Sequence, residues 1–160
     1  MSSQVRSVID DCVSGKSQWP LVMFGEAGSG KTCTALVLAD WAGSAKYTTQ
    51  VQLCSDIIAA NKGQLRWSGG HAKSAREIWS AWKNANFTVL DELATRKTVT
   101  DFQYETIKQA IDLREGQPSI VISNLSIKEI DSVFDDRIAS RLRGGTIIEL
   151  SGDRRVQPTT

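Results

Sequence analysis

One stretch of the chain, GEAGSGKT at residues 25–32, limits the possible folds more than any other. It directly follows the apolar run at residues 21–24 and directly precedes a second apolar run at residues 33–39. Its spacing fits the pattern G-x-x-x-x-G-K-[ST], in which glycines let consecutive backbone N–H groups turn toward one centre. A strand, a tight loop and a helix in this order also aim the positive end of the helix at an anion. The stretch therefore predicts a phosphate-binding loop rather than a flexible glycine turn.

The loop assigns separate tasks to its last residues. Lys31 is expected to contact the β- and γ-phosphate oxygens of a nucleotide, and the Thr32 hydroxyl is expected to ligate Mg²⁺. No G-x-G-x-x-G pattern occurs, which disfavours a dinucleotide site. The residues expected to bind ATP are Gly25, Glu26, Ala27, Gly28, Ser29, Gly30, Lys31, Thr32 and Cys33.

Short apolar runs alternate with helical patterns along the rest of the chain. The runs lie at residues 21–24, 87–90, 120–122 and 146–150, with a weaker one at residues 47–49. Helical patterns open at two capping boxes, which begin at Thr100 and Ser126. Continuous apolar strands are buried on both faces, so the alternation predicts an α/β protein with a parallel sheet between two layers of helices.

Two carboxylates and an amide follow predicted strands. Asp91 and Glu92 come directly after the run at residues 87–90, and Asn124 follows the run at residues 120–122. Ligands bind at the carboxyl ends of parallel strands, so Asp91 is expected to hold Mg²⁺ and Glu92 to polarise the attacking water. Asn124 is suited to hydrogen-bond the γ-phosphate or that water. The alternative is a solvated strand end and an ordinary turn.

Two further groups of cations are candidates for binding. Arg137 and Arg141 lie four residues apart on one helix face, where an arginine could reach a neighbouring subunit's γ-phosphate. The alternative is that Asp135 and Asp136 pair with them at the surface. The stretch at residues 61–76 has cations, glycines and one tryptophan but no acid, a composition suited to single-stranded nucleic acid. Its candidate contacts are Lys62, Arg66, Trp67, Lys73 and Arg76.

That stretch also has a simpler interpretation, a solvated loop in which Trp67 packs inward. His71 has no second His or Cys at ligand spacing and is expected to lie at the surface rather than bind a metal. The three cysteines are scattered and are expected to be small buried residues.

Composition fits one ordinary domain. The 160 residues carry a net charge of +1, which excludes a globally basic nucleic-acid coat. No apolar run approaches the roughly 18 residues of a membrane span, and the amino terminus lacks a secretory pattern, so we expect a cytoplasmic protein.

The motifs GEAGSGKT, FTVLDE, VISNLS, FDDRIASRL and SGDRR together resemble the AAA+ ATPase domain of DnaC/DnaI-type helicase loaders and the related IstB transposition helpers. The resemblance implies a P-loop NTPase fold with a five-stranded parallel sheet in order 5-1-4-3-2 and no helical lid. It makes Asn124 similar to sensor 1, Arg141 to the arginine finger with Arg137 as a second candidate, and Arg154 or Arg155 to sensor 2.

The resemblance also implies partners. These are ATP and ADP, single-stranded DNA, a replicative helicase or a transposase, and further copies of this chain joined through a trans-acting arginine finger. Loaders carry an amino-terminal module that grips the helicase, whereas this chain begins shortly before the phosphate loop. We therefore expect residues 1–160 to form a single AAA+ ATPase domain without that module.

Three functions fit the motifs. The first is Mg-ATP binding and hydrolysis by a helicase-loader-like ATPase that remodels a nucleoprotein in DNA replication or transposition. The second is a small-molecule or nucleotide kinase, which has no need of a water-polarising acid such as Glu92. The third is a nucleotide-gated binding module with little turnover.

Overall fold

The computed structural model describes residues 3–152. Its helices are α1 (Ser3–Val13), α2 (Lys31–Ala42), α3 (Gln50–Asn61), α4 (Ala75–Lys83), α5 (Asp101–Asp112), α6 (Ile127–Val133) and α7 (Asp136–Arg143). Its strands are β1 (Leu21–Phe24), β2 (Ala45–Thr49), β3 (Phe87–Leu93), β4 (Ser119–Ser123) and β5 (Thr146–Glu149).

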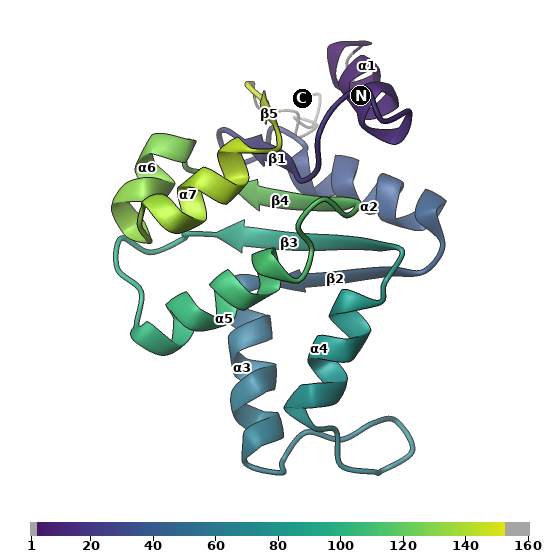
Figure 1. Ribbon diagram of the computed structural model, residues 1–160, viewed down its shortest axis with the longest axis vertical. Coiled ribbons are helices and arrows are strands. Elements are labelled where there is room, and N and C mark those ends of the chain that lie inside the picture. Colours follow the sequence, from purple (N-terminus) through teal and green to yellow (C-terminus); the bar gives the residue numbers. More distant parts are fainter. Residues whose placement is uncertain (1–2, 153–160) are drawn as a thin grey trace, which may run out of the picture.

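The strands form one parallel sheet in the order β2-β3-β4-β1-β5 (Figure 1). This is the expected order 5-1-4-3-2, so the predicted fold is confirmed. β3 is longer than its apolar run predicts, because it continues through the acidic pair to Leu93. A register shift between Leu90 and Leu93 accommodates that extension against β4.

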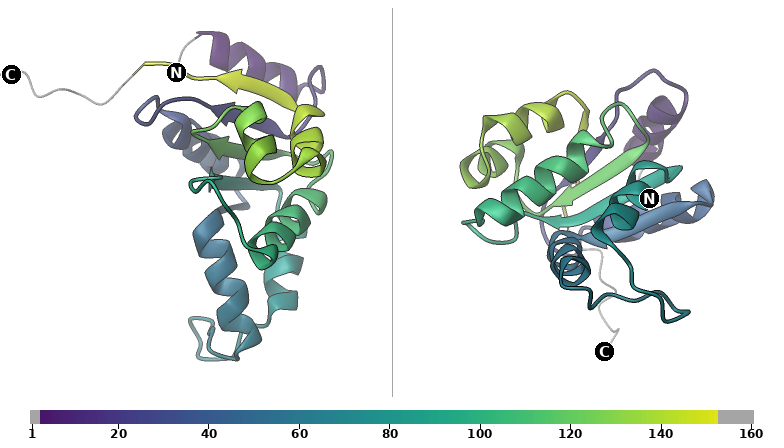
Figure 2. Two further views of the ribbon diagram at one scale, coloured as in Figure 1. Left: turned by 90° about the vertical axis from the view of Figure 1, so that its left-hand side faces the viewer. Right: turned by 60° about the horizontal axis from the view of Figure 1, so that its bottom comes forward.

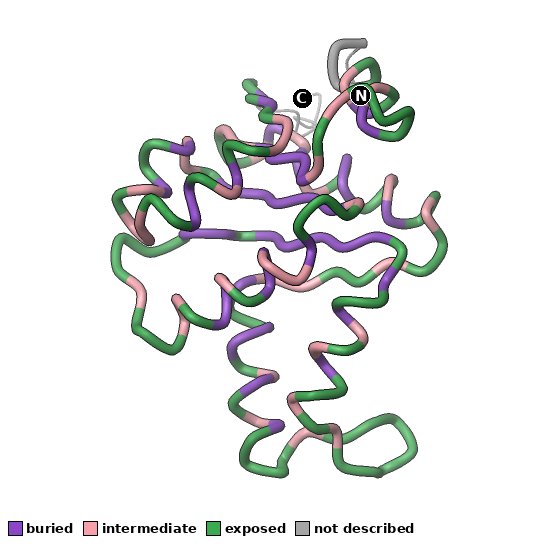
Figure 3. The backbone as a smooth tube through the Cα atoms, in the orientation of Figure 1, coloured by how far each residue is buried: buried purple, intermediate pink, exposed green. Residues whose placement is uncertain are grey.

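Helices cover both faces of the sheet. On one face α1 and α2 pack through Ile9, Cys12, Ala35 and Ala39 against alternate strand residues such as Met23. On the other face the remaining helices pack against the intervening strand residues, including Val22, Leu90 and Val121. Because successive strand side chains point to opposite faces, one apolar run supplies both cores. β3 and β4 are accordingly buried along most of their length (Figure 3).

Capping boxes fix where several helices begin. The Thr100 and Ser126 boxes form as predicted, and a third box, in which Ser74 and Glu77 cap α4, was not anticipated. The backbone N–H and hydroxyl of Ser74 both donate to Glu77, and these hydrogen bonds lower the pKa of the Glu77 carboxyl. Each box satisfies helix-end donors that would otherwise lack a partner.

α3 and α4 project away from the sheet and are joined at their far ends by an exposed connection (Figures 1 and 3). An isolated bridge between Arg66 and Ala72 shapes this connection as a narrow hairpin. No helix follows β5 within residues 3–152. None of the helices in that range is both long and apolar enough to cross a membrane.

Gly25, which follows β1, leaves no room for a side chain. A Cβ atom built there would lie 2.1 Å from the backbone oxygen of Leu150, and its φ is +133°. Gly43 also has a positive φ, +77°, but a Cβ at that position would meet nothing within 4 Å. The two glycines thus share a backbone constraint and differ in the space around them.

We expect Gly25→Ala to lower the melting temperature more than Gly43→Ala does. Both variants place alanine at a positive φ, but only the first forces β1 and the end of β5 apart. Such overpacking costs about 1–3 kcal/mol, and each kcal/mol shifts the melting temperature of a domain of this size by about 2–4 °C. Equal melting temperatures in a thermal denaturation experiment would contradict the close approach at Gly25.

Candidate functional site

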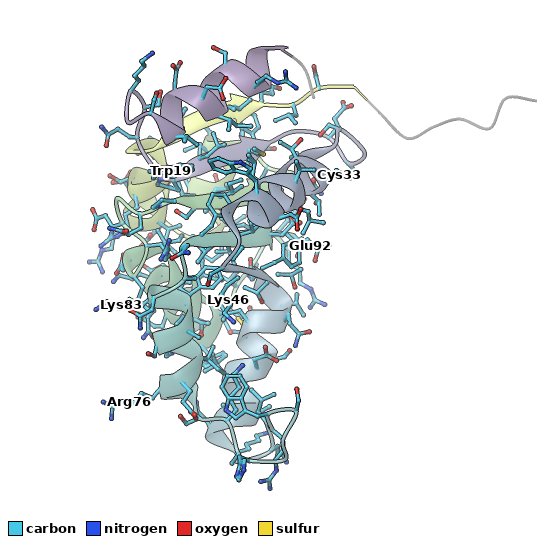
Figure 4. The ribbon with its side chains drawn as sticks, turned by 90° about the vertical axis from the view of Figure 1, so that its right-hand side faces the viewer. Trp19, Cys33, Lys46, Arg76, Lys83 and Glu92 are labelled. Carbon is cyan, nitrogen blue, oxygen red and sulfur yellow. The ribbon has the colours of Figure 1, made fainter. Side chains whose placement is uncertain are left out.

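The loop after β1 and the carboxyl ends of β3 and β4 meet at one edge of the sheet. Together with the start of α2, they line a cleft of about 600 Å³. Figure 4 shows Cys33 and Glu92 at this edge, away from Trp19 and Lys83. The residues lining the cleft are Ala27, Gly28, Gly30, Lys31, Thr32, Cys33, Thr34, Asp91, Glu92, Ile122, Ser123 and Asn124.

The glycine loop presents backbone donors to this cleft. Gly28 and Gly30 have φ angles of +84° and +90°, which only glycine adopts without strain. No side chain caps α2, and no described residue accepts a hydrogen bond from the N–H groups of Lys31, Thr32 or Cys33. These free amides lie at the positive end of the helix dipole, so the loop fits a phosphate group.

Lys31 is buried at the base of the loop. Its ammonium donates to the backbone oxygens of Gly25 and Glu26, each at 2.7 Å, and to the Ser29 hydroxyl at 3.3 Å. Burial lowers the pKa of Lys31, and the negative charge of Asp91 partly opposes that shift. The ammonium is thus held beside the free amides by neutral oxygens.

Asp91 joins the loop to β3. Its Oδ2 accepts a hydrogen bond from the Thr32 hydroxyl at 2.8 Å, although the two residues are 59 positions apart in the sequence. Oδ2 also accepts from the Tyr47 hydroxyl at 2.9 Å, and Oδ1 accepts from the Glu92 N–H at 2.7 Å. The carboxylate is only 3% exposed and all its contacts are with donors, so it is suited to a cation such as Mg²⁺.

Tyr47 is a contact that the sequence pattern does not reveal. It lies on β2, which pairs with β3 so that Tyr47 stands opposite Val89, on the face of the sheet that Asp91 shares. Burial and the Asp91 contact raise the pKa of the Tyr47 hydroxyl to about 12, so the hydroxyl stays protonated and can donate this hydrogen bond throughout the physiological pH range. The one sequence signal that could have pointed to Tyr47 is the polar character of the weak run at residues 47–49.

The backbone of the acidic segment, residues 91–94, is strained. Glu92 and Ala94 have φ angles of +56° and +60°, although neither is glycine. Such conformations cost about 1–3 kcal/mol each and persist only where the surroundings enforce them. Here Gln50 accepts a hydrogen bond from the Ala94 N–H at 2.9 Å, and Ser123 donates to the Leu93 carbonyl at 2.7 Å.

The strained turn directs Glu92 outward. Glu92 is exposed and lines the cleft, whereas Asp91 beside it is buried. Asn124 is also exposed and lines the same cleft from the end of β4. Two adjacent carboxylates therefore differ in environment, one fixed by donors and one free to contact solvent.

The cysteines differ in exposure. Cys12 and Cys54 are buried, as expected, but Cys33 is exposed at the cleft, which corrects that prediction for this residue. Its place in the first turn of α2, directly after Thr32, turns its side chain away from the core.

Arg141 lies at the opposite edge of the sheet. It lines a separate cavity with residues at the amino ends of strands, such as Trp19 before β1 and Ser119 at the start of β4, and it pairs with Asp112 of α5. The alternative in which Asp135 and Asp136 pair with Arg137 and Arg141 is not found among the ion pairs of the described residues. Asp136 pairs with Arg143 instead.

Asp135 is occupied by other donors. It caps α7 by accepting from the Arg137 and Ile138 N–H groups, and it also accepts from the Tyr104 hydroxyl. The Arg137 side chain is exposed and makes no ion pair with the described residues. Arg154 and Arg155 lie outside the described residues.

In the connection between α3 and α4, Lys62 and Arg66 are exposed and Lys73 is half-buried. We call residues 62–76 the basic segment. Trp67 is 43% exposed, which overturns the interpretation in which it packs inward. The Lys73 ammonium lies 4.3 Å from the centre of the Trp67 ring, and the indole N–H donates to Glu77. His71 is exposed, as expected.

These features define the class. A parallel sheet in this order, a glycine loop before α2 and an acidic pair at the end of β3 together form the AAA+ type of P-loop NTPase fold. No protein-family model and no curated protein matches the sequence.

Solved structures share this fold. DnaA from Aquifex aeolicus bound to AMPPCP matches with a TM-score of 0.75 and 18% identity, over 92% of this chain and 46% of that chain. DnaA bound to AMPPCP and single-stranded DNA matches with a TM-score of 0.76 and 18% identity, over 94% and 46%. The DnaC helicase loader matches with a TM-score of 0.71 and 17% identity, over 94% and 92%.

The chain spans just under half the length of the DnaA chains it matches. At these identities the likeness shows the fold, and the resemblance to helicase loaders is confirmed at that level.

Proposed function

We propose that this protein binds and hydrolyses Mg-ATP. The observation that carries the proposal is the hydrogen bond between Thr32 and Asp91, which brings the phosphate loop and the acidic strand end into one cleft. A hydroxyl and a carboxylate from these two positions are the protein ligands that Mg²⁺ takes in phosphate-loop enzymes, where phosphate oxygens and water complete its shell.

Each residue then has a task in the reaction. Lys31 and the free amides of α2 hold the β- and γ-phosphates, and Thr32 with Asp91 holds Mg²⁺. When bound there, Mg²⁺ would neutralise part of the phosphate charge. Glu92 orients and polarises the attacking water, and Asn124 donates to the water or to the γ-phosphate. The exposure of Glu92 beside buried Asp91 supports this division.

The partner is proposed from the fold and the surface. The near-complete coverage of the DnaC helicase loader supports action on a nucleoprotein in replication or transposition, with a replicative helicase or transposase as partner. The exposed basic segment supports contact with single-stranded DNA. Arg141 lies at the edge opposite its own cleft, which supports a head-to-tail oligomer in which it serves the neighbouring subunit's site.

Two substitutions separate binding from hydrolysis. We expect Lys31→Ala to abolish ATP binding, because the ammonium that lies at the loop is lost. Lys46→Ala, at an exposed lysine of β2, should leave ATP binding unchanged. Glu92→Gln should retain ATP but lower kcat by about a hundredfold or more, since the group that polarises water is removed. The measurements are ATP affinity by calorimetry and phosphate release.

Micromolar affinity in Lys31→Ala would refute the phosphate-loop assignment. If the wild type turns over slowly and Glu92→Gln has the same rate, the nucleotide-gated binding module is favoured. Phosphate transfer that requires an added acceptor would favour the kinase.

The shared site is tested by mixing variants. Arg141→Ala should bind ATP normally and lose turnover by on the order of 10³-fold, because a trans-acting arginine stabilises transition-state charge. Arg143→Ala, which removes an exposed arginine paired with Asp131 and Asp136, is the matched control. Mixing Arg141→Ala with Glu92→Gln subunits should restore part of the activity, because some interfaces then contain one intact site. Absence of rescue would argue against a shared site, and Arg137→Ala tests the second candidate in the same way.

The basic segment is tested by salt dependence. The triple replacement of Lys62, Arg66 and Lys73 by alanine should weaken binding to single-stranded DNA. It should also reduce the slope of log affinity against log salt concentration by about 2, since each phosphate contact contributes about 0.7 to that slope. The control replaces three exposed lysines elsewhere, Lys16, Lys46 and Lys83. If the two triple variants have equal slopes in fluorescence anisotropy titrations, the basic segment does not contact the strand.

A further inference from the structure

The acidic segment is held from one side by the corner where β2 ends and α3 begins. Tyr47, near the end of β2, donates to Asp91, and Gln50, the first residue of α3, accepts from Ala94. We propose that Tyr47 and Gln50 are positioning residues that clamp the two ends of the acidic segment, so that Asp91 faces the metal and Glu92 faces the attacking water. This inference rests on the proposed ATPase function.

Tyr47 fixes the orientation of the Asp91 carboxylate. Oδ1 is held by the neighbouring N–H of Glu92, so the plane of the carboxylate depends on what binds Oδ2. Thr32, in the first turn of α2, and Tyr47, on the strand β2 that follows this helix in the chain, both donate to Oδ2. Thr32 is also the proposed metal ligand, so Tyr47 is the donor that has no second task. Groups that orient a metal ligand in this way typically affect metal affinity or activity by about 10–100-fold.

Gln50 fixes the other end of the segment. Its side chain is buried, and its amide oxygen accepts a hydrogen bond from the Ala94 N–H rather than from its own helix. Ala94 has a positive φ and is followed by an exposed loop, so the chain there would relax toward an ordinary backbone conformation without this acceptor. Relaxation at Ala94 would turn the Glu92 carboxylate, two residues earlier, away from the cleft. Gln50 therefore acts on Glu92, whereas Tyr47 acts on Asp91.

A merely structural role is the competing explanation. The Tyr47 residue is 43% exposed, so its ring contributes little buried surface, and its hydroxyl contact is the part that lies within the site. The proposal predicts a different defect for each residue: loss of Tyr47 should weaken the response to Mg²⁺, and loss of Gln50 should lower turnover. General destabilisation would not produce these two separate defects, so a positioning role can be distinguished from a structural one.

The test for Tyr47 uses a matched pair of tyrosines. Tyr47→Phe and Tyr104→Phe each remove a hydroxyl that donates to an aspartate, since Tyr104 donates to Asp135 Oδ2 at 2.8 Å away from the cleft. ATP affinity is measured by calorimetry in excess Mg²⁺ and in EDTA. We expect Tyr47→Phe to reduce the gain in ATP affinity that Mg²⁺ provides by about tenfold, with the affinity in EDTA unchanged. Tyr104→Phe should leave both affinities as in the wild type.

The test for Gln50 uses its neighbour on the first turn of α3. Gln50→Ala should lower kcat about tenfold while ATP affinity in EDTA stays the same. Gln52→Ala, which removes an exposed side chain that donates to Asp56, is the control and should keep kcat. Gln50→Glu retains an acceptor oxygen for the Ala94 N–H and should restore part of the lost kcat. It also keeps the prediction testable if Gln50→Ala does not fold.

The outcomes distinguish this inference from the proposed function. If the wild-type protein does not bind Mg-ATP, the proposed function fails and the clamp fails with it. If the wild type binds and hydrolyses ATP but Tyr47→Phe responds to Mg²⁺ as Tyr104→Phe does, the role of Tyr47 is refuted alone. Equal loss of affinity with and without Mg²⁺ would assign Tyr47 a structural role. A Gln50→Ala variant with wild-type kcat would refute the role of Gln50.

Discussion

The contact between Thr32 and Asp91 depends on the order of the strands. β4 lies between β1 and β3, so the phosphate loop and the acidic segment belong to strands that do not pair. They can meet only beyond the carboxyl end of β4, where that strand finishes at Ser123 and the chain turns toward Asn124. The cleft is therefore a property of the sheet order, because β4 keeps β1 and β3 apart and its carboxyl end lines the space between them.

A strained segment at this point is consistent with a functional site. β3 departs from regular pairing after Leu90, and two non-glycine residues adopt positive φ angles within the next four positions. The cost of that backbone is offset by contacts from three directions. Ser123 holds the Leu93 carbonyl, Gln50 holds the Ala94 N–H, and Asp91 accepts the N–H of Glu92. In a regular strand, the adjacent side chains of Asp91 and Glu92 would point to opposite faces of the sheet. The strained backbone lets both carboxylates line the same cleft.

Much of the fold could be predicted from the sequence because its signals are local. The apolar runs, the capping boxes at Thr100 and Ser126, and the glycine pattern each depend on residues that are close together in the chain. The sheet order came from the resemblance of the motifs, since periodicity alone does not order strands. Strand ends were less predictable, because the extension of β3 to Leu93 is stabilised by Ser123 and Gln50, which are distant in the sequence.

Side-chain partners were the least predictable part. Arg141 of α7 pairs with Asp112 of α5, so the alternative that paired it with the nearer Asp135 or Asp136 was wrong. Trp67 is exposed because its hairpin extends beyond the core, a feature that composition does not report. The role of Tyr47 could not be predicted from the sequence either, because the pairing of β2 with β3 is what brings Tyr47 next to Asp91.

The placement of α3 has a mechanical consequence. The helix has 12 residues and therefore spans about 18 Å, with Gln50 against the acidic segment and the basic segment at the far end. If α3 tilted by about 10° about Gln50, its far end would move by about 3 Å, which is the length of a hydrogen bond. A movement of that size would be large enough to make or break a contact at Lys62.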